Sequence, residues 1–380
     1  MTFWSIVYVI GAAQAVLLAL ALWRRPVNAE GNHVLAGWIA LIGLDLAIKA
    51  LYFPMPGPDT FKAYRFVGLF PFLYGSLFYV YVRALTEARA FGRRDAIHLA
   101  GFVIAVLLNT ELFLMDRTQT QAFIAHLRAG GKMPLTPWLD IALFAYSLSY
   151  VVAALVRVRR YRHGLLQRRS DAETMSLRWI DAMALSQVVI WCIALLQWLF
   201  RIPWIDYPLI YGAVVAWVFV VGYLSLGQVA VAAEAPPEDV PANAGDPSPA
   251  DDPRFPTVEA RLAQLMAQEH LYREPALTIG QLARRSGYPE YLVSTVINRR
   301  FDGNFWAYIN RLRIEAARAC LADRNDARTV LDIAYDCGFT SKSTFNAAFK
   351  RELAETPSAY RQRHAHATTS ASAPEDVGPG

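Results

Sequence analysis

Residues 279–288 read IGQLARRSGY, and residues 330–339, 51 positions further along the chain, read VLDIAYDCGF. In both stretches apolar residues recur with helical spacing up to a glycine, which can take the left-handed conformation that ends a helix. A second amphipathic stretch follows each glycine and carries Ile297 in the first copy and Phe349 in the second. The repeat predicts two helix-turn-helix motifs in one all-α domain.

Between the two copies, residues 305–322 predict a single connecting helix. At 1.5 Å per residue this helix is about 27 Å long, close to the roughly 34 Å between successive major grooves on one face of DNA. We therefore expect the second helix of each motif to enter the same duplex. The residues on the apolar faces should form the core: Leu282, Ala283, Leu292, Val296, Ile333, Phe339, Phe345 and Phe349.

At these residues the chain resembles the C-terminal DNA-binding domain of the AraC/XylS family of bacterial transcription regulators. The resemblance covers 258–363 and rests on the run FWAYINRLRIEAA at 305–317 and on a second run over 333–361 that ends in TPSAYR. It implies a sequence-specific regulator that binds double-stranded DNA and RNA polymerase, and neither an enzyme nor a cofactor or metal protein. The best-known members carry a soluble sugar-binding domain ahead of this module, which this sequence lacks, so their ligand does not transfer.

The resemblance also implies which residues contact DNA. Base contacts fall on Glu290, Tyr291, Ser294, Thr295 and Asn298 in the first recognition helix, and on Lys342, Ser343, Asn346 and Ala347 in the second. The long basic side chains often seen in the family at the places of Thr295 and Ala347 are missing here, so Lys342, or Asn346 paired to adenine, is the better candidate for specific readout. Ala354 replaces a usual glycine after the second recognition helix and puts the expected helix cap in question.

Six basic residues are expected to anchor DNA phosphates: Arg299, Arg300, Arg311, Lys350, Arg351 and Arg361. The alternative for any one of them is a solvated surface position.

The N-terminal part of the chain has a different composition. The whole chain is 55% hydrophobic and 18% charged, with a mean hydropathy of +0.24, which excludes a single soluble enzyme domain. Seven apolar stretches reach the roughly 20 residues that a membrane-spanning helix needs. They are 3–23, 34–52, 64–82, 96–115, 138–156, 180–200 and 207–226. Residues 1–226 are therefore predicted to form a seven-helix transmembrane bundle.

Basic residues set the expected orientation of this bundle. The loops after the first, third and fifth stretches carry 13 Lys and Arg residues, against six in the other loops. Because bases are retained on the cytoplasmic side, we expect a multi-pass protein of the bacterial inner membrane with a periplasmic N-terminus and a cytoplasmic C-terminus. A cleaved signal peptide is the alternative for 3–23, but no base precedes the apolar run and Arg24 and Arg25 follow it.

The charges divide the rest of the chain. Residues 227–253 hold six acids and no base, which together with their Pro and Ala content predicts a disordered acidic linker. Residues 254–365 carry a net charge of +5 and form the predicted DNA-binding domain. Residues 366–380 are small and polar and predict a disordered tail.

Asp45 and Lys49 are ionisable residues inside the second stretch, four positions apart on one helix face. They can form either a structural ion pair or a sensor contact, since charges within a membrane are costly and need a reason. The three cysteines, Cys192, Cys320 and Cys337, show no C-x-x-C spacing, and the last two are expected in the core.

Together these patterns favour a membrane-anchored transcription regulator that couples a signal sensed by its transmembrane bundle to gene expression. Membrane lipid is then a partner, and a membrane protein, a small hydrophobic ligand or a second copy of the chain are further candidates. The alternative is a transporter or lipid-modifying enzyme with a regulatory DNA-binding module. Proteolytic release of the domain through cleavage in the linker is a third mechanism. The signal, the target promoters and the choice between activation and repression stay open.

Overall fold

The computed structural model describes residues 3–131, 136–172, 178–200, 207–226, 231, 252–301 and 303–366. Within these ranges every named element is a helix, and the extended pairing is limited to an isolated bridge between Arg169 and Thr278, which confirms the predicted all-α class there. The chain forms two compact units: unit 1 comprises Met1–Arg160 and Leu177–Ala235, and unit 2 comprises Tyr161–Ser176 and Pro236–Gly380. Almost all of the predicted linker 227–253 and the tail from residue 367 lie outside the described residues.

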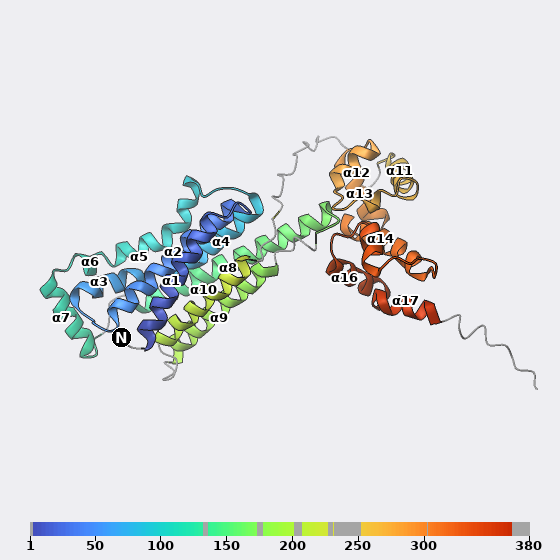
Figure 1. Cartoon of the computed structure of the whole chain (residues 1–380). Helices are drawn as coiled ribbons and strands as arrows, with labels where there is room; N and C mark the ends of the chain where they lie inside the picture. The colour runs from blue at the N-terminus through green and yellow to red at the C-terminus, as the bar shows by residue number, and fades with distance from the viewer. Residues whose placement is uncertain are drawn as a thin grey trace, which may run out of the picture. The chain divides into compact units, whose positions relative to one another are not determined.

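Unit 1 is built from the N-terminal helices. They are α1 (Phe3–Trp23), α2 (Ala29–Tyr52), α3 (Pro58–Val67), α4 (Pro71–Glu87), η1 (Arg93–Leu99), α5 (Ala100–Leu108), α6 (Thr110–Leu114), α7 (Arg117–Arg128), α8 (Thr136–Arg168), α9 (Arg178–Phe200) and α10 (Tyr207–Leu226). The last part of α8, from Tyr161 onward, belongs to unit 2. Helix α1 lies against α2 and α10, and α2 also packs on α4 (Figure 1). At the centre, the ring of Trp38 lies 5.0 Å from that of Trp217 and 6.1 Å from that of Phe78, which joins α2, α10 and α4.

Five of the seven predicted spans correspond to single helices: α1, α2, α8, α9 and α10. The other two are divided. The predicted span 64–82 breaks at 68–70, and Pro71 begins α4, where a proline is well tolerated because the first helical position has no intrahelical partner for an amide hydrogen. The predicted span 96–115 breaks at Asn109, whose side-chain amide donates to the Ala105 carbonyl (2.8 Å).

Among the described residues, five helical stretches are long and apolar enough to cross a membrane: Phe3–Trp23, Ala29–Tyr52, Pro58–Glu87, Trp138–Arg168 and Trp179–Phe200. A shorter apolar helix covers Leu209–Ser225. These are statements of length and composition, so the seven-span bundle stays a prediction.

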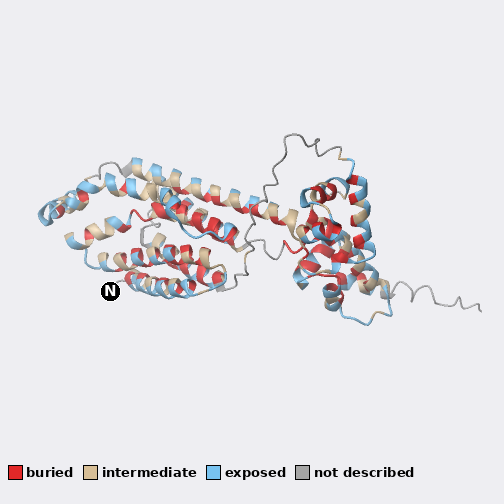
Figure 2. Ribbon diagram, turned by 90° about the horizontal axis from the view of Figure 1, so that it is seen from above, coloured by how far each residue is buried: buried red, intermediate tan, exposed pale blue. Residues whose placement is uncertain are grey.

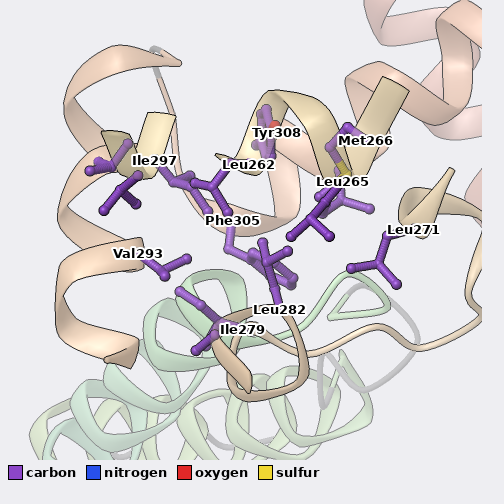
Figure 3. Packing of buried hydrophobic residues seen from close by; sticks show 14 of the residues in the cluster. Leu262, Leu265, Met266, Leu271, Ile279, Leu282, Val293, Ile297, Phe305 and Tyr308 are labelled. Atoms are coloured by element: carbon purple, nitrogen blue, oxygen red, sulfur yellow. The ribbon is translucent and has the colours of Figure 1, made fainter. Parts of the chain in front are cut away.

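Unit 2 contains the C-terminal helices. They are α11 (Phe255–Ala267), η2 (Leu271–Arg273), α12 (Ile279–Ser286), α13 (Glu290–Arg300), α14 (Phe305–Ala322), α15 (Val330–Asp336), α16 (Lys342–Leu353) and α17 (Pro357–His366). The connecting helix α14 has the predicted bounds and contributes to two hydrophobic cores. The first core includes Leu262, Leu282, Val293 and Phe305 (Figure 3), and the second groups α15, α16 and α17 around the other end of α14.

All eight residues that the sequence placed in the core of this domain are buried, with exposed fractions of 6% or less. The burial pattern of the domain alternates along each helix, with buried faces turned inward and exposed faces outward (Figure 2). Cys337 belongs to the second core, whereas Cys320 is half-buried at its edge and Cys192 of α9 is exposed.

Candidate nucleic-acid interface

Each helix-turn-helix motif begins with the same capping arrangement. Thr278 accepts a hydrogen bond from the backbone N–H of Gln281, whose side chain accepts from the Thr278 N–H (2.7 Å). In the second motif Thr329 and Asp332 form the equivalent pair. Neither capping box was among the sequence predictions, although the T-x-x-Q and T-x-x-D spacing indicates one.

A glycine follows the first helix of each motif, as predicted. Gly287 has φ of 79° and Gly338 has φ of 91°, so both are left-handed and turn the chain toward the recognition helix. A Cβ atom on Gly287 would meet nothing within 4 Å, whereas one on Gly338 would lie 2.7 Å from the Arg273 carbonyl oxygen. The second glycine is therefore required both by its backbone conformation and by a close backbone contact.

The first recognition helix, α13, buries Leu292, Val293, Val296 and Ile297 and turns its predicted base-contact residues away from this core. Glu290, Tyr291 and Asn298 are exposed, and Ser294 and Thr295 are partly exposed. The hydroxyl of Thr295 donates to the Tyr291 carbonyl (2.8 Å), so toward DNA it offers acceptor lone pairs and a methyl group. The Arg254 side chain also donates to the Tyr291 hydroxyl (3.2 Å).

The second recognition helix, α16, begins at a side-chain cap from Ser341, which accepts from the Thr344 N–H. It buries Thr344, Phe345, Ala348 and Phe349. All four predicted base-contact residues of this helix are exposed: Lys342, Ser343, Asn346 and Ala347. Both recognition helices thus present the predicted residues on their solvent faces, and their contacts with DNA stay a prediction.

The six predicted phosphate anchors differ in their surroundings. Arg299, Arg300, Arg311, Lys350 and Arg351 are exposed, and Arg361 is half-buried. Arg300 lies 3.5 Å from the Glu259 carboxylate, and Arg351 stacks 4.3 Å from the centre of the Trp306 ring. Arg361 donates to the carbonyl oxygens of Asp326 and Arg328. It therefore stabilises the loop before α15. Its position in the sequence motif did not indicate this structural role.

The helix cap questioned at Ala354 does form. Ala354 has φ of 59° and its N–H donates to the Lys350 carbonyl (2.9 Å), so alanine occupies a left-handed position after α16. This conformation costs an alanine roughly 1–2 kcal/mol relative to a right-handed one.

Arg313 of α14 links η2 and the turn after it to the second motif, a role that the sequence pattern did not indicate. Its Nε donates to the Tyr272 carbonyl (2.7 Å), one terminal nitrogen donates to the Glu274 carbonyl (2.8 Å), and the guanidinium lies 5.7 Å from the Phe339 ring centre. Burial lowers the pKa of Arg313 to about 10, which leaves it charged at neutral pH. Arg313 lies four residues after Ile309, on the same buried face of α14, and this spacing is the feature of the sequence that could have predicted its burial.

In unit 1, the predicted pairing of Asp45 and Lys49 is present. The Lys49 ammonium lies 2.5 Å and 2.6 Å from the two carboxylate oxygens of Asp45, and both side chains are buried. The Tyr74 hydroxyl donates to the same carboxylate (3.4 Å), and the ammonium lies 3.6 Å from the Tyr211 ring centre. Across the described ranges, three or more His, Cys, Asp or Glu residues nowhere come together as a metal site.

Comparisons with known proteins concern the C-terminal part of the chain. A family profile described as a helix-turn-helix domain matches residues 282–363. Regulatory protein SoxS of Salmonella typhimurium strain LT2 is 34% identical over 95 residues, which cover 25% of this chain and 85% of that protein. The Right origin-binding protein of Escherichia coli K12 is 33% identical over 86 residues, 23% of this chain and 29% of that protein. Transcriptional regulator Rob of Salmonella typhimurium is 31% identical over 86 residues, 23% of this chain and 29% of that protein. No solved structure matches the chain.

Proposed function

Because the chain belongs to the AraC family of DNA-binding transcription regulators, whose members are not enzymes, we propose that it is a membrane-anchored regulator. In this proposal the N-terminal helices receive a signal and the C-terminal domain binds promoter DNA and contacts RNA polymerase. The observation that carries it is the combination, in one chain, of two exposed recognition helices with five helical stretches apolar enough to span a bilayer.

The outward faces of the N-terminal helices support the anchor. Helix α1 exposes large apolar side chains along its whole length, including Phe3 at 72% and Leu17 at 64%. Leu107 of α5 and Val152 of α8 are exposed as well. A water-soluble protein rarely leaves apolar surface of this extent uncovered, whereas lipid covers it at no cost.

Chromatin immunoprecipitation with the full-length chain tests DNA binding. We expect specific enrichment that is lost in the double variant Lys342→Ala, Asn346→Ala and is retained in Gln362→Ala, which changes an exposed residue of α17 that is not among the predicted DNA contacts. Equal enrichment in the double variant and in the control would contradict base readout by the second motif.

The anchor is tested separately, by alkaline extraction of membranes and by topology reporters. The chain should stay in the membrane pellet after extraction, and a reporter fused after Gly380 should show cytoplasmic activity. Release of the full-length chain into the soluble fraction would contradict the anchor without affecting the conclusion about DNA binding.

We place the candidate for signal input at Asp45 and Lys49. A buried pair of opposite charges is strongly destabilised when one partner is removed, by roughly 3–5 kcal/mol, but tolerates joint replacement by apolar residues. The variant Asp45→Leu, Lys49→Met should therefore accumulate normally while the single variants should not. Under this proposal, a reporter gene driven by a regulated promoter is expressed at a constant level in the double variant, under conditions that change its expression with the wild-type protein. A normal response would leave the pair with a structural role alone.

A further inference from the structure

Residues 169–171, which follow α8 and which we call the docking segment, lie against the DNA-binding domain within unit 2. The Ser170 N–H donates to the Leu277 carbonyl (3.0 Å). The Asn310 side-chain amide donates to the Ser170 carbonyl (3.3 Å), and Arg313 donates to the Ser170 hydroxyl (3.1 Å). Ser170 is only 1% exposed, so both its backbone and its side chain are enclosed.

The residues on either side of Ser170 strengthen this contact. Arg169 forms an antiparallel bridge with Thr278, the cap residue of α12. Asp171 is buried at 6% exposure and forms an ion pair with Arg169 (2.8 Å). The negative charge of Asp171 also opposes the burial that lowers the pKa of Arg313. The segment thus brings a carboxylate close to Arg313, which is itself only 1% exposed.

The docking segment contacts a residue that connects different parts of the domain. Arg313 also donates to the carbonyls of Tyr272 and Glu274 and packs on Phe339 of the second motif. Without the docking segment, Asn310 and Arg313 would each lose a hydrogen-bond partner at a buried site, which is costly. The family profile begins at residue 282, more than 100 positions after the segment. The surface of the domain around α14 is therefore completed by a part of the chain outside the family module.

We propose that the docking segment is the element by which the N-terminal part of the chain holds the DNA-binding domain, and that docking fixes the spacing of the two recognition helices. This inference rests on the proposed function. The segment lies between the fifth and sixth predicted spans, so a change in those helices is passed to it through a few residues of chain. The acidic stretch 227–253 is then a tether, and the docking segment is the specific contact.

The docked arrangement is the DNA-binding form. With the segment in place, Lys342, Asn346 and Asn298 are exposed, so docking leaves the recognition faces uncovered. The hydrogen bonds of Ser170 to Asn310 and Arg313 also restrict the relative movement of the two motifs before DNA binds. Preorganisation of this kind raises the affinity for DNA.

Disulfide cross-linking in the full-length membrane protein tests docking directly. Residues paired across an antiparallel bridge have Cα atoms about 4.5–5.5 Å apart, within the range that a disulfide spans. The variant Arg169→Cys, Thr278→Cys, with a protease site inserted in the 227–253 linker, should stay in one covalent piece after cleavage under oxidising conditions and separate after reduction. The single-cysteine variants and the pair His163→Cys, Thr278→Cys, in which His163 is exposed, are the matched controls.

A cross-link no more frequent in the bridge pair than in these controls, in protein that still binds DNA when reduced, overturns the docking. Hydrogen exchange of the unmodified chain gives a second measurement that no substitution can disturb. The Ser170 amide should exchange slowly because it donates to Leu277, and exchange at the rate of an open loop overturns the proposal equally.

DNA affinity tests the consequence of docking. The enclosed Ser170 site has no room for an indole, so Ser170→Trp should expel the segment and weaken binding to an immunoprecipitated promoter fragment about fivefold, the equivalent of one hydrogen bond. His163→Trp should leave binding unchanged. Equal affinity of the two variants overturns the coupling. Failure of the wild-type chain to bind any enriched fragment overturns the proposed function itself, whereas the cross-linking result does not depend on DNA.

Discussion

The two helix-turn-helix motifs share one plan but are secured differently. The first is closed by a large core that includes α11, its turn glycine Gly287 stands in open space, and its recognition helix starts at Pro289 without a side-chain cap. The second has a smaller core, a recognition helix capped by Ser341, and a turn glycine, Gly338, packed against the backbone of η2, which precedes the first motif and belongs to the first core. The turn of the second motif is therefore positioned against the η2 segment that leads into the first motif.

The two glycines should show this difference most strongly. Gly338→Ala adds a left-handed strain of roughly 1–2 kcal/mol to a clash with the Arg273 carbonyl, and overpacking typically costs about 1–3 kcal/mol, so we expect a loss of about 2–5 kcal/mol. Gly287→Ala carries the strain alone. Hydrogen exchange of α15 and α16 in the full-length chain measures the first effect, and exchange of α12 and α13 measures the second. Equal losses would show that the contact at Gly338 is not tight.

The recognition helices should contribute unequally to sequence readout. Lys342→Ala, Asn346→Ala removes two exposed polar groups from α16 and should weaken specific binding roughly 10- to 100-fold, since a good base contact is worth about 1–3 kcal/mol. Thr295→Ala, Asn298→Ala in α13 should cost less, because the Thr295 hydroxyl hydrogen is already donated to Tyr291. Fluorescence anisotropy with an immunoprecipitated promoter fragment and a scrambled one gives both values. A larger loss from the α13 pair would reverse the assignment.

The salt dependence of DNA affinity distinguishes basic residues that contact phosphates from arginines with a structural role. Arg299→Ala in the first motif and Lys350→Ala in the second should each lower the slope of log affinity against log salt by about 0.9, the value for one phosphate neutralised on duplex DNA. Arg361→Ala should leave the slope unchanged, since its guanidinium is bonded to the carbonyls of Asp326 and Arg328. A fall in slope for Arg361→Ala would restore it as a phosphate anchor.

Local periodicity made most of unit 2 predictable. The helix α14 has the bounds that its sequence indicated, and residues such as Leu282 and Phe345 were identifiable as core because 3.6-residue spacing fixes which face is buried. In unit 1, apolar composition continues across residues 68–70 and across Asn109, so composition alone did not reveal those breaks.

Contacts between distant residues could not be read from the sequence. Arg313 meets carbonyls 39 and 41 positions away, and Ser170 lies 140 positions from Asn310. Nothing in the composition of 169–171 distinguishes this segment from any other polar loop, and the burial of Ser170 follows from a fit between surfaces that only the folded domain creates.

The end of α16 offers a gain in stability on the second motif. Ala354 occupies a left-handed position at the end of α16, so Ala354→Gly should stabilise this motif by about 0.5–1 kcal/mol, the strain relieved less the added freedom of the unfolded chain. Slower hydrogen exchange at the end of α16, with α13 unaffected as the internal control, would confirm it. Faster exchange would mean that the alanine methyl group contributes packing that outweighs the strain.

The smallest expected effect is a difference between the two capping boxes in how their stabilisation depends on pH. The first uses Gln281, which does not titrate, and the second uses Asp332, whose pKa is lowered from its usual range by hydrogen bonds from the Thr329 hydroxyl and backbone N–H. Since the folded state favours the carboxylate, its contribution is full above the unfolded pKa of about 3.9 and is lost as pH falls through the folded value. Asp332→Asn should therefore speed α15 opening at pH 7 and have a smaller effect as the pH falls below about 3.9, whereas Gln281→Ala should have the same effect on α12 across this range. An Asp332→Asn effect that does not decline as the pH is lowered would assign the stabilisation to packing rather than to charge.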